Sequence, residues 1–186
     1  MNLAHFDTAI GRCAVLWTAS GVCGVCLPKT DLTADTAWMR RHFPAAVLAG
    51  PPSTVANAIL RIQGLLNGSQ DSLKDIDLDL GRVGDFEHKV YDLTREILPG
   101  QTRTYGELAN ALGDIALSRA VGQALGANPC PIIVPCHRVL GAGGKSGGFS
   151  APGGLETKAR ILTIEKARTS DAPMLFDDLP VEFRNG

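Results

Sequence analysis

The first hydrophobic pattern along the chain is a pair of strand-like runs close to the N-terminus. Residues 12–19 and 22–27 are rich in valine, leucine and cysteine, and Ser20-Gly21 lies between them. Because apolar runs separated by a two-residue turn with glycine are typical of β-hairpins, we predict two antiparallel strands here. Pro28 lacks a backbone N–H and is expected to end the second strand.

The following segments alternate between helical and strand-like patterns. Residues 35–42 and 55–66 have helical periodicity, and Asn67-Gly68 closes the second helix. The apolar face of that second helix consists of Val55, Ile59, Ile62 and Leu66. A further strand is expected from the recurring apolar residues Leu73, Ile76, Leu78 and Leu80. Two glycines within residues 81–85 interrupt the pattern, so we place a domain boundary there, after a small α/β unit.

From residue 86 onwards the pattern becomes helical. The first helix is indicated by the spacing of Phe86, Val90, Leu93 and Ile97. Thr104 and Glu107 have the spacing of a capping box, which predicts a helix over 105–112. A second short helix is expected over 118–125 and ends at Gly126. Two short helices joined by a turn indicate either a helix-turn-helix or a helical hairpin without a role in DNA binding.

The rest of the chain predicts an extended segment, a loop and a last helix. Residues 129–140 are apolar and expected to be extended, and residues 141–154 contain seven glycines. The last helix, over 155–167, would have one face made of Leu155, Ala159, Leu162 and Lys166. The predicted organisation is therefore an N-terminal α/β domain at 1–83, a mostly α domain at 84–168 and an acidic tail at 169–186.

Composition and charge add a general class but no function. With 45% hydrophobic and 20% charged residues, the chain resembles an ordinary soluble protein, and no apolar run is long enough to span a membrane. Five cysteines without framework-like spacing suit a reducing compartment, so we expect free thiols and a cytoplasmic location. Net charges of 0, +2 and -3 for the three predicted segments make the middle one compatible with DNA binding, although an ordinary solvated surface has the same balance.

Cys136 and His137 form the densest concentration of reactive groups in the chain. A thiol with a pKa of about 8.5 is only a few per cent thiolate at neutral pH, so a nucleophilic cysteine needs a base or a positive charge nearby. His137 and Arg138 can supply these. Neighbours on an extended strand face opposite sides, so His137 reaches the thiol only through a turn after Pro135 or a bridging water. The alternative is a buried, inert cysteine and histidine.

Residues 128–139, which read Asn-Pro-Cys-Pro-Ile-Ile-Val-Pro-Cys-His-Arg-Val, resemble the active-site signature of the O6-alkylguanine-DNA alkyltransferases. Four further motifs occur in the order of that family: Thr104-Tyr-Gly-Glu-Leu-Ala109, Ser118-Arg-Ala-Val-Gly122, Gly148-Phe-Ser150 and Gly153-Gly-Leu155. The resemblance is strong over residues 86–167 and weak before them. It implies a ribonuclease-H-like α/β unit with a small antiparallel sheet, followed by a mostly α domain with a winged-helix-like helix-turn-helix.

The resemblance also implies roles for matching residues of this chain. Cys136 would accept the alkyl group irreversibly and pass its proton through a water to His137, while Glu165 stabilises the imidazolium and Asn128 organises the turn. Four residues would hold the base: Tyr105 at ring atom N3, Val139 through its carbonyl at the exocyclic amine, Phe149 as a stacking wall and Ser150 through its backbone at O6. Phe149 replaces a tyrosine of some family members, so only stacking remains there.

The implied partner is double-stranded DNA that contains O6-alkylguanine. An alkylated base inside a duplex is out of reach, so the nucleotide must be flipped into the protein. Arg119 matches the finger residue that fills the vacated place, and the small residues Ala120, Gly122 and Ala124 would allow a close approach to the minor groove. We expect a monomer without a cofactor or a membrane contact, and cooperative binding along DNA stays open.

One other motif and two alternative functions complete the sequence analysis. Cys23-Gly-Val-Cys26 has the spacing of half a metal site, but residues three apart on a strand should face opposite sides, so no metal is expected. A relative that binds the lesion without transfer is one alternative, although such proteins have another residue in place of the acceptor cysteine. A Cys-His hydrolase, which would turn over and need an oxyanion hole, is the other.

Overall fold

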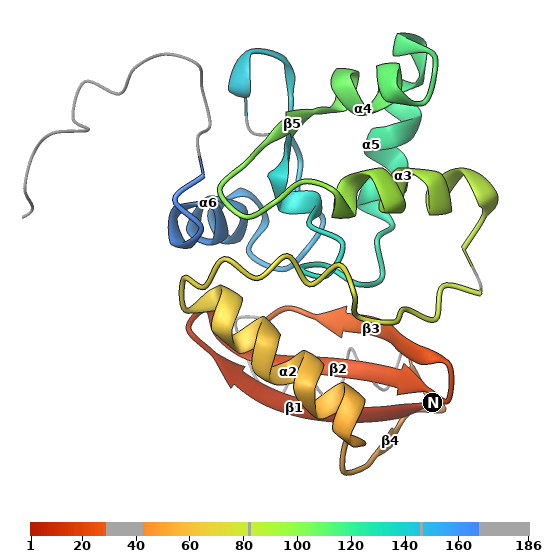
Figure 1. The fold of residues 1–186 in the computed structure, drawn as a ribbon, viewed down its shortest axis with the longest axis vertical. Coiled ribbons are helices and arrows are strands. Elements are labelled where there is room, and N and C mark those ends of the chain that lie inside the picture. Colours follow the sequence, from red (N-terminus) through yellow and green to blue (C-terminus); the bar gives the residue numbers. More distant parts are fainter. Residues whose placement is uncertain (29–42, 82, 146, 168–186) are drawn as a thin grey trace, which may run out of the picture.

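The computed structural model describes residues 1–28, 43–81, 83–145 and 147–167. Among these, the N-terminal half holds a four-stranded sheet of β1 (Asn2–Thr8), β2 (Gly11–Thr18), β3 (Gly21–Cys26) and β4 (Val47–Leu48), in the order β3-β2-β1-β4 (Figure 1). β1, β2 and β3 pair antiparallel, whereas β4 runs parallel to β1. The sheet is therefore mixed, and the prediction of a purely antiparallel one is wrong in this respect.

The predicted hairpin is confirmed, with β2 and β3 each beginning one residue earlier than expected. Gly21 in its turn has a φ of 143°, and a Cβ there would lie 2.6 Å from the carbonyl oxygen of Asp77, so only glycine fits. β1 was not predicted, because His5 and Asp7 interrupt its apolar residues. Its pairing with β2, which sets Phe6 opposite Cys13, is what buries it.

The helix predicted over 55–66 is confirmed as α2 (Ser53–Leu66), which lies across one face of the sheet (Figure 1). The strand predicted over 73–80 is wrong, since this segment is irregular and forms a single bridge between Val22 and Leu78. Leu73, Ile76 and Leu80 are buried all the same, and Arg95 donates to three backbone carbonyls of the segment. The helix predicted over 35–42 and the tail at 169–186 lie outside the described residues.

The C-terminal half is mostly helical, as predicted. Its described elements are α3 (Asp85–Arg95), β5 (Arg103–Thr104), α4 (Tyr105–Ala111), η1 (Ile115–Leu117), α5 (Ser118–Gly126), η2 (Cys136–Arg138), β6 (Val139–Leu140), η3 (Ala142–Gly144) and α6 (Gly154–Ile164). The capping box is confirmed: Thr104 Oγ1 accepts from the Glu107 N–H at 3.1 Å, and Glu107 Oε2 accepts from the Thr104 N–H at 2.6 Å. The two short helices α4 and α5 with a turn between them are confirmed as well.

Two predictions for this half are wrong. Residues 129–138 are not extended, because Val134 N–H donates to the Cys130 carbonyl at 2.8 Å and a 3-10 turn follows at Cys136; only Val139–Leu140 form a strand. The buried face of α6 is not the predicted one either, since Leu155 is 49% exposed. It consists of Lys158, Ile161, Leu162 and Glu165. Hydrophobic periodicity misplaces this face because two of its members are charged residues whose burial depends on distant partners.

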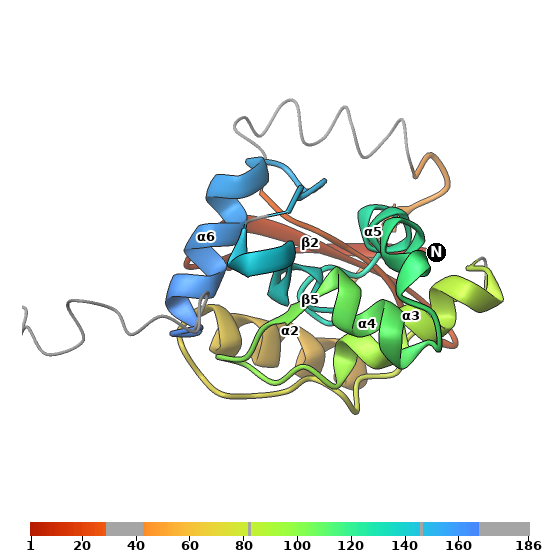
Figure 2. The ribbon, with the colours of Figure 1, turned by 90° about the horizontal axis from the view of Figure 1, so that it is seen from above.

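The two halves are joined by backbone contacts and share an apolar core. At the outer edge of β3, the Val25 N–H donates to the Pro129 carbonyl at 2.9 Å. On the other side, Arg160 of α6 donates to the carbonyls of Ala9 and Ile10 in the β1–β2 turn. Seen from above, α6 and the α3–α5 group lie at opposite ends of the sheet (Figure 2). None of the described helices is long and apolar enough to cross a membrane.

Candidate active site

Cys136 opens a 3-10 turn between the apolar loop and β6. The Cys136 N–H donates to the Val134 carbonyl at 2.8 Å, and the Arg138 N–H donates to the Pro135 carbonyl at 2.9 Å. The chain therefore turns after Pro135, which is one of the two alternatives by which His137 was expected to reach the thiol. Cys136 is 8% exposed and lines a cavity of about 250 Å³, which makes it buried but accessible from one side.

Asn128 braces the loop that carries the cysteine. Its Oδ1 accepts from the Cys130 N–H and its Nδ2 donates to the Val134 carbonyl, both at 2.9 Å. Between these two points Ile132 has a φ of 77°, a left-handed conformation that is costly for a β-branched residue. Ile132 is also fully buried. The side-chain amide of Asn128 and the surrounding core therefore hold the loop in a conformation that it would not adopt alone.

Behind the turn, three buried charged or ionisable residues form one network. Glu165 Oε1 lies 3.0 Å from His137 Nε2 and accepts from Arg138 at 2.7 Å, while its Oε2 accepts from Arg138 Nε at 2.9 Å. Arg138 also donates to the Ile97 carbonyl at 2.6 Å. All three side chains are at most 1% exposed. Glu165 is therefore brought to His137 from the end of α6, and its charge is balanced by Arg138.

The protonation of this network follows from its burial and charges. Burial favours the neutral form of Glu165, but hydrogen bonds from His137 and Arg138 outweigh it and lower the pKa to about 2. Burial lowers the pKa of His137 despite the raising effect of Glu165, so the ring is neutral at pH 7. A carboxylate only accepts, so Nε2 must carry the ring proton and Nδ1 a lone pair. That Nδ1 is buried and has no hydrogen-bond partner among the described residues.

Lys158 is a site residue that the sequence analysis missed. It is fully buried, its Nζ donates to the Val139 carbonyl at 2.6 Å, and burial lowers its pKa. Burial raises the pKa of the Cys136 thiol, against the lowering effects of Asn128 and Lys158. One signal was present in the sequence: Lys158 and Glu165 share the helical stripe of Ile161 and Leu162. The predicted face of Leu155, Ala159, Leu162 and Lys166 did not include either Lys158 or Glu165.

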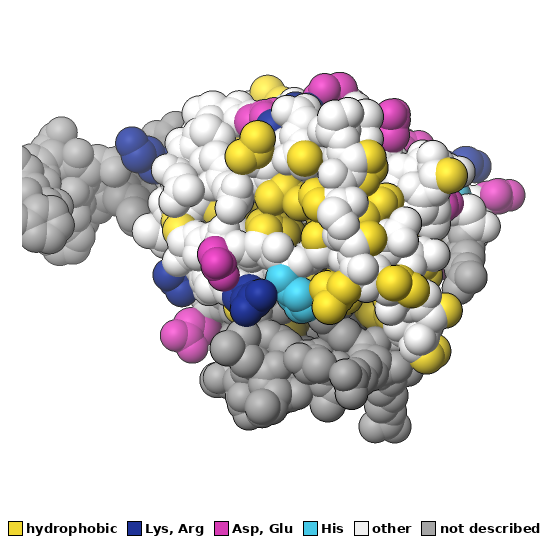
Figure 3. All heavy atoms as spheres, turned by 90° about the horizontal axis from the view of Figure 1, so that it is seen from below, with side chains coloured by type: hydrophobic (Ala, Val, Ile, Leu, Met, Phe, Trp, Pro, Cys, Tyr) yellow, Lys and Arg dark blue, Asp and Glu magenta, His cyan; other side chains and the backbone are white. Residues whose placement is uncertain are grey.

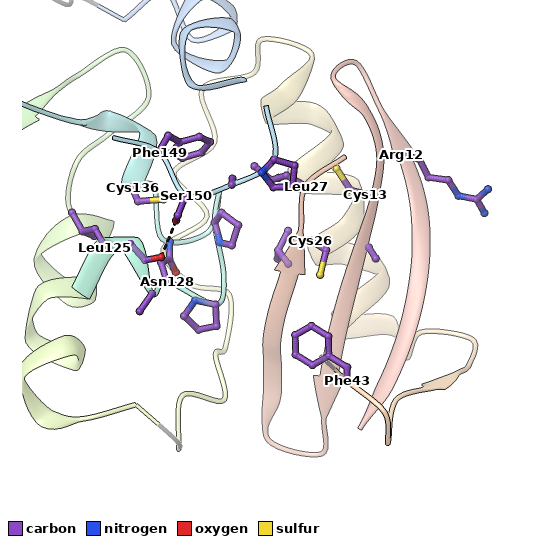
Figure 4. A pocket seen from close by; sticks show the side chains of 18 of the residues that line it. Arg12, Cys13, Cys26, Leu27, Phe43, Leu125, Asn128, Cys136, Phe149 and Ser150 are labelled. Atoms are coloured by element: carbon purple, nitrogen blue, oxygen red, sulfur yellow. Dashed lines mark hydrogen bonds between the residues drawn. The ribbon is translucent and has the colours of Figure 1, made fainter. Parts of the chain in front are cut away.

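Two of the four residues predicted to hold the base line the cavity of Cys136. Phe149 and Ser150 line the same cavity as Cys136, and the Ser150 hydroxyl donates to the Gly126 carbonyl at 2.8 Å (Figure 4). Tyr105 and Val139 are not among the residues lining this cavity. The Tyr105 hydroxyl donates to the Gly148 carbonyl at 3.5 Å, in the loop that carries Phe149 and Ser150, and burial, with a smaller effect of Cys136, raises its pKa.

The residues predicted to contact DNA lie on α5, but not all on one face. Arg119 is exposed and Ala120 and Gly122 are partly exposed. Ala124 is only 4% exposed, and its carbonyl accepts from the buried Tyr91 hydroxyl at 2.9 Å. Ala124 packs inward, so we assign it to the core rather than to the surface that would face DNA.

Cys23 and Cys26 lie on the same face of the sheet, which corrects the prediction that they face opposite sides. Both pack against the cluster of Leu3, Ala14 and Leu16. The reason is a β-bulge: Trp17 pairs with Val22 and Leu16 with Gly24, so Cys23 is the extra residue of β3. Among the described residues, no group of three or more histidine, cysteine or acidic side chains is placed to hold a metal ion.

Over most of its length, the chain is similar to known methylated-DNA–protein-cysteine methyltransferases. Residues 85–167 match the family model of the 6-O-methylguanine DNA methyltransferase DNA binding domain. A methylated-DNA–protein-cysteine methyltransferase of Mycobacterium bovis is 40% identical over 126 residues, 68% of this chain and 74% of that protein. The inducible enzyme of that name in Bacillus subtilis is 36% identical over 72% of this chain and 73% of its own length.

Solved structures show the same similarity in three dimensions. Mycobacterium tuberculosis OGT in complex with DNA has a TM-score of 0.71 and 32% identity, and the match covers 89% of this chain and 93% of that one. The O6-methylguanine-DNA methyltransferase of Pyrococcus kodakaraensis has a TM-score of 0.67 and 29% identity, with 88% and 98% covered.

A buried cysteine beside a histidine–carboxylate pair, in a domain with two short helices joined by a turn, defines a class of DNA-repair proteins with a cysteine acceptor. Within that class, the chain belongs to the methylated-DNA–protein-cysteine methyltransferase family.

Proposed function

We propose that this protein repairs DNA by direct reversal, moving the alkyl group from O6 of a guanine in double-stranded DNA onto Cys136, once per molecule. The observation that carries the proposal is the environment of Cys136. The cysteine lines a cavity, and the next residue, His137, binds Glu165 through one ring nitrogen and has no partner for the other among the described residues. Relatives that match most of this chain are named for the same transfer.

The resting cysteine is a thiol, because burial raises its pKa, and the base that activates it is His137. Nδ1 of His137 holds a lone pair and takes the thiol proton through one bridging water, while Glu165 stabilises the imidazolium that forms. Arg138 keeps Glu165 ionised throughout. The positive charge of Lys158 near Cys136 favours the thiolate.

Transfer is an in-line displacement at the alkyl carbon. The Sγ–carbon bond forms as the O6–carbon bond breaks, and the electron pair of the broken bond leaves with the guanine. The proton removed from Cys136 ends on the guanine, which stays in the DNA. Atoms and charge therefore balance without a cofactor. The product is a thioether, which water does not cleave under these conditions, so each molecule acts once.

The base is held by residues on both sides of the acceptor. Tyr105 donates to N3, the Val139 carbonyl accepts from the exocyclic amine, and the Ser150 backbone faces O6 with Phe149 as the stacking wall. The Val139 carbonyl already accepts from Lys158 at 2.6 Å, and its second lone pair is left for the substrate. Lys158 therefore orients the Val139 carbonyl, which accepts from the base, and also favours the thiolate of Cys136.

DNA binds on the α4–α5 side, with the alkylated nucleotide flipped into the cavity and Arg119 in its place. The partly exposed Ala120 and Gly122 keep α5 narrow enough to approach the minor groove. The opposite end of the molecule suits DNA poorly. There, the coloured side chains form a hydrophobic area ringed by scattered charges of both signs, without a concentration of lysine and arginine (Figure 3).

The finer fold assignments belong to the same proposal. We infer a ribonuclease-H-like domain over residues 1–83 and a winged-helix-like DNA-binding domain over residues 84–168. The two-stranded sheet of β5 and β6, which flanks the α4–α5 pair, supports the second assignment.

Incubation with duplex DNA containing O6-methylguanine, followed by mass spectrometry, tests the proposal. We expect the protein to gain one methylene mass, peptide mapping to place it on Cys136 and not on the buried Cys130, and the yield to stop at one equivalent with DNA in excess. A Cys136→Ser variant should bind the same DNA and gain no mass. Binding without mass gain by the natural protein would identify a lesion-binding protein, and many turnovers would identify a hydrolase; either result refutes the proposal.

A further inference from the structure

The position of α5, the helix that would face DNA, depends on what it packs against. It is only nine residues long, has Gly122 in its interior and lacks a side-chain cap at its N-terminus. An isolated helix of this length is marginal in water, and glycine lowers its helix propensity further. Its buried side chains are Val121, Ala124 and Leu125. Such apolar contacts attract without direction, so they fix the position of α5 along its own axis less sharply than a hydrogen bond does.

Tyr91 gives α5 a directional contact. It lies on α3, which packs beside α5 (Figure 2), and it is 1% exposed. Its hydroxyl donates to the Ala124 carbonyl at 2.9 Å. Burial raises the pKa of this hydroxyl to about 12, so it keeps its proton and remains a donor at neutral pH. Because a hydrogen bond requires a narrow range of distance and angle, this contact sets where α5 lies relative to α3.

Ala124 lies between the part of α5 that would contact DNA and the loop that carries the acceptor. Arg119 precedes it by five residues, which is about 7.5 Å along a helix axis. On the other side, the Gly126 carbonyl accepts from the Ser150 hydroxyl at 2.8 Å, and Asn128 braces the acceptor loop. A shift of α5 at Ala124 would therefore move Arg119 relative to the acceptor turn.

We propose that Tyr91 is a positioning residue for repair: through the Ala124 carbonyl it holds α5 where Arg119 enters the duplex as the flipped base reaches the acceptor cavity. The proposal rests on transfer to Cys136 and adds a residue outside the site. Tyr91 does not line the cavity of Cys136 and is too deeply buried to contact DNA, so it acts through α5.

Tyr91→Phe tests the proposal, because it removes only the hydroxyl. The Ala124 carbonyl keeps the Ala127 N–H as a donor at 3.1 Å, so the end of α5 is not left unpaired. Thr94→Val is the matched control. Thr94 is fully buried and its hydroxyl donates to the Val90 carbonyl of α3 itself at 2.7 Å, so this change removes a buried hydroxyl of the same helix without a direct effect on α5.

Two rate constants separate positioning on DNA from activation of the thiol. Transfer from duplex DNA with O6-methylguanine is measured in single turnover by intact mass, and the reaction of Cys136 with iodoacetamide, without DNA, is measured by peptide mapping. We expect Tyr91→Phe to slow transfer from the duplex about fivefold or more and to change the iodoacetamide rate by less than about twofold. Thr94→Val should alter neither rate.

A double-mutant cycle with Arg119 tests the route of the effect. If Tyr91 acts by placing Arg119, adding Tyr91→Phe to an Arg119→Ala variant should slow transfer by less than about twofold, because the side chain to be placed is already absent. Losses that multiply fully would show that the hydroxyl acts by another route and would overturn the proposal.

The outcomes also separate this proposal from the one on which it rests. If the natural protein transfers methyl but Tyr91→Phe leaves the transfer rate unchanged, or slows the iodoacetamide reaction equally, Tyr91 does not position α5 and the repair function stands. Equal slowing of transfer by Thr94→Val would assign the effect to a general loss of stability, with the same conclusion. If the natural protein transfers no methyl group, both proposals are wrong.

Discussion

Glu165→Gln tests the buried network behind the acceptor turn. Glu165 is 1% exposed and accepts three hydrogen bonds, one from His137 and two from Arg138. Glutamine has nearly the same size, but its amide sets a donor against the guanidinium and removes the counter-charge of Arg138. Breaking a buried ion pair in this way costs about 3 to 5 kcal/mol, out of a total stability of about 5 to 15 kcal/mol. For a chain of this length, Tm should fall by about 6 to 20 °C.

The effect of this substitution should depend on pH in a defined direction. The pKa of Glu165 is lowered from its usual value of 4.5 to about 2, so its ionised form stabilises the folded protein. That contribution is fully present above pH 4.5, the unfolded value, and is lost as the pH falls toward about 2. The difference in unfolding free energy between the natural protein and the variant should therefore be constant above pH 4.5 and shrink below it.

Denaturant unfolding followed by circular dichroism, at pH 7 and at acidic pH, measures this difference. Glu156→Gln, an exposed change in the first turn of the same helix, is the control and should alter stability by less than about 0.5 kcal/mol. A Glu165→Gln variant within about 1 kcal/mol of the natural protein at pH 7 would show that the carboxylate is not the counter-charge of Arg138.

Three further substitutions test other parts of the site. Arg119→Ala should weaken transfer from duplex DNA and leave transfer from a free O6-alkylguanine base unchanged, as single-turnover kinetics on both substrates would reveal. Lys158→Met leaves the Val139 carbonyl without its buried donor and removes a positive charge near Cys136, so the transfer rate at pH 7 should fall about tenfold while circular dichroism shows a folded protein. Gly147→Ala would set a Cβ 2.6 Å from the Tyr105 ring; Kd for alkylated duplex DNA should rise, and an unchanged Kd would mean that the ring position is unimportant.

The elements that were predicted correctly are those specified by neighbours in the sequence. The Thr104–Glu107 capping box involves residues three apart, and the turn at Gly21 depends on one residue that accepts a positive φ. The helix α4 has a start signal of its own, and α2 and α5 have buried apolar stripes. Such signals do not depend on the rest of the chain, which is why they can be read from the sequence.

The elements that were predicted wrongly depend on distant partners. β1 is a strand because β2 pairs with it, although its own pattern contains His5 and Asp7. Residues 73–80 look like a strand but pair with β3 only at the bridge between Val22 and Leu78, and Arg95 donates to three of their other carbonyls. The bulge that turns Cys23 onto the face of Cys26 is likewise a property of the pairing with β2.

For the site, the sequence by itself determined the reactive residues: Cys136, His137 and Arg138 are adjacent, and the surrounding motif identified the family. Only the tertiary structure decided what makes them a site. Glu165 lies 28 residues from His137 in sequence, and the buried Lys158 lies 19 residues from Val139, so folding must bring each pair together. Cys26 of β3, in the other half of the chain, lines the same cavity as Cys136. Charges are buried here because distant partners compensate them, and a hydrophobic pattern does not encode that compensation.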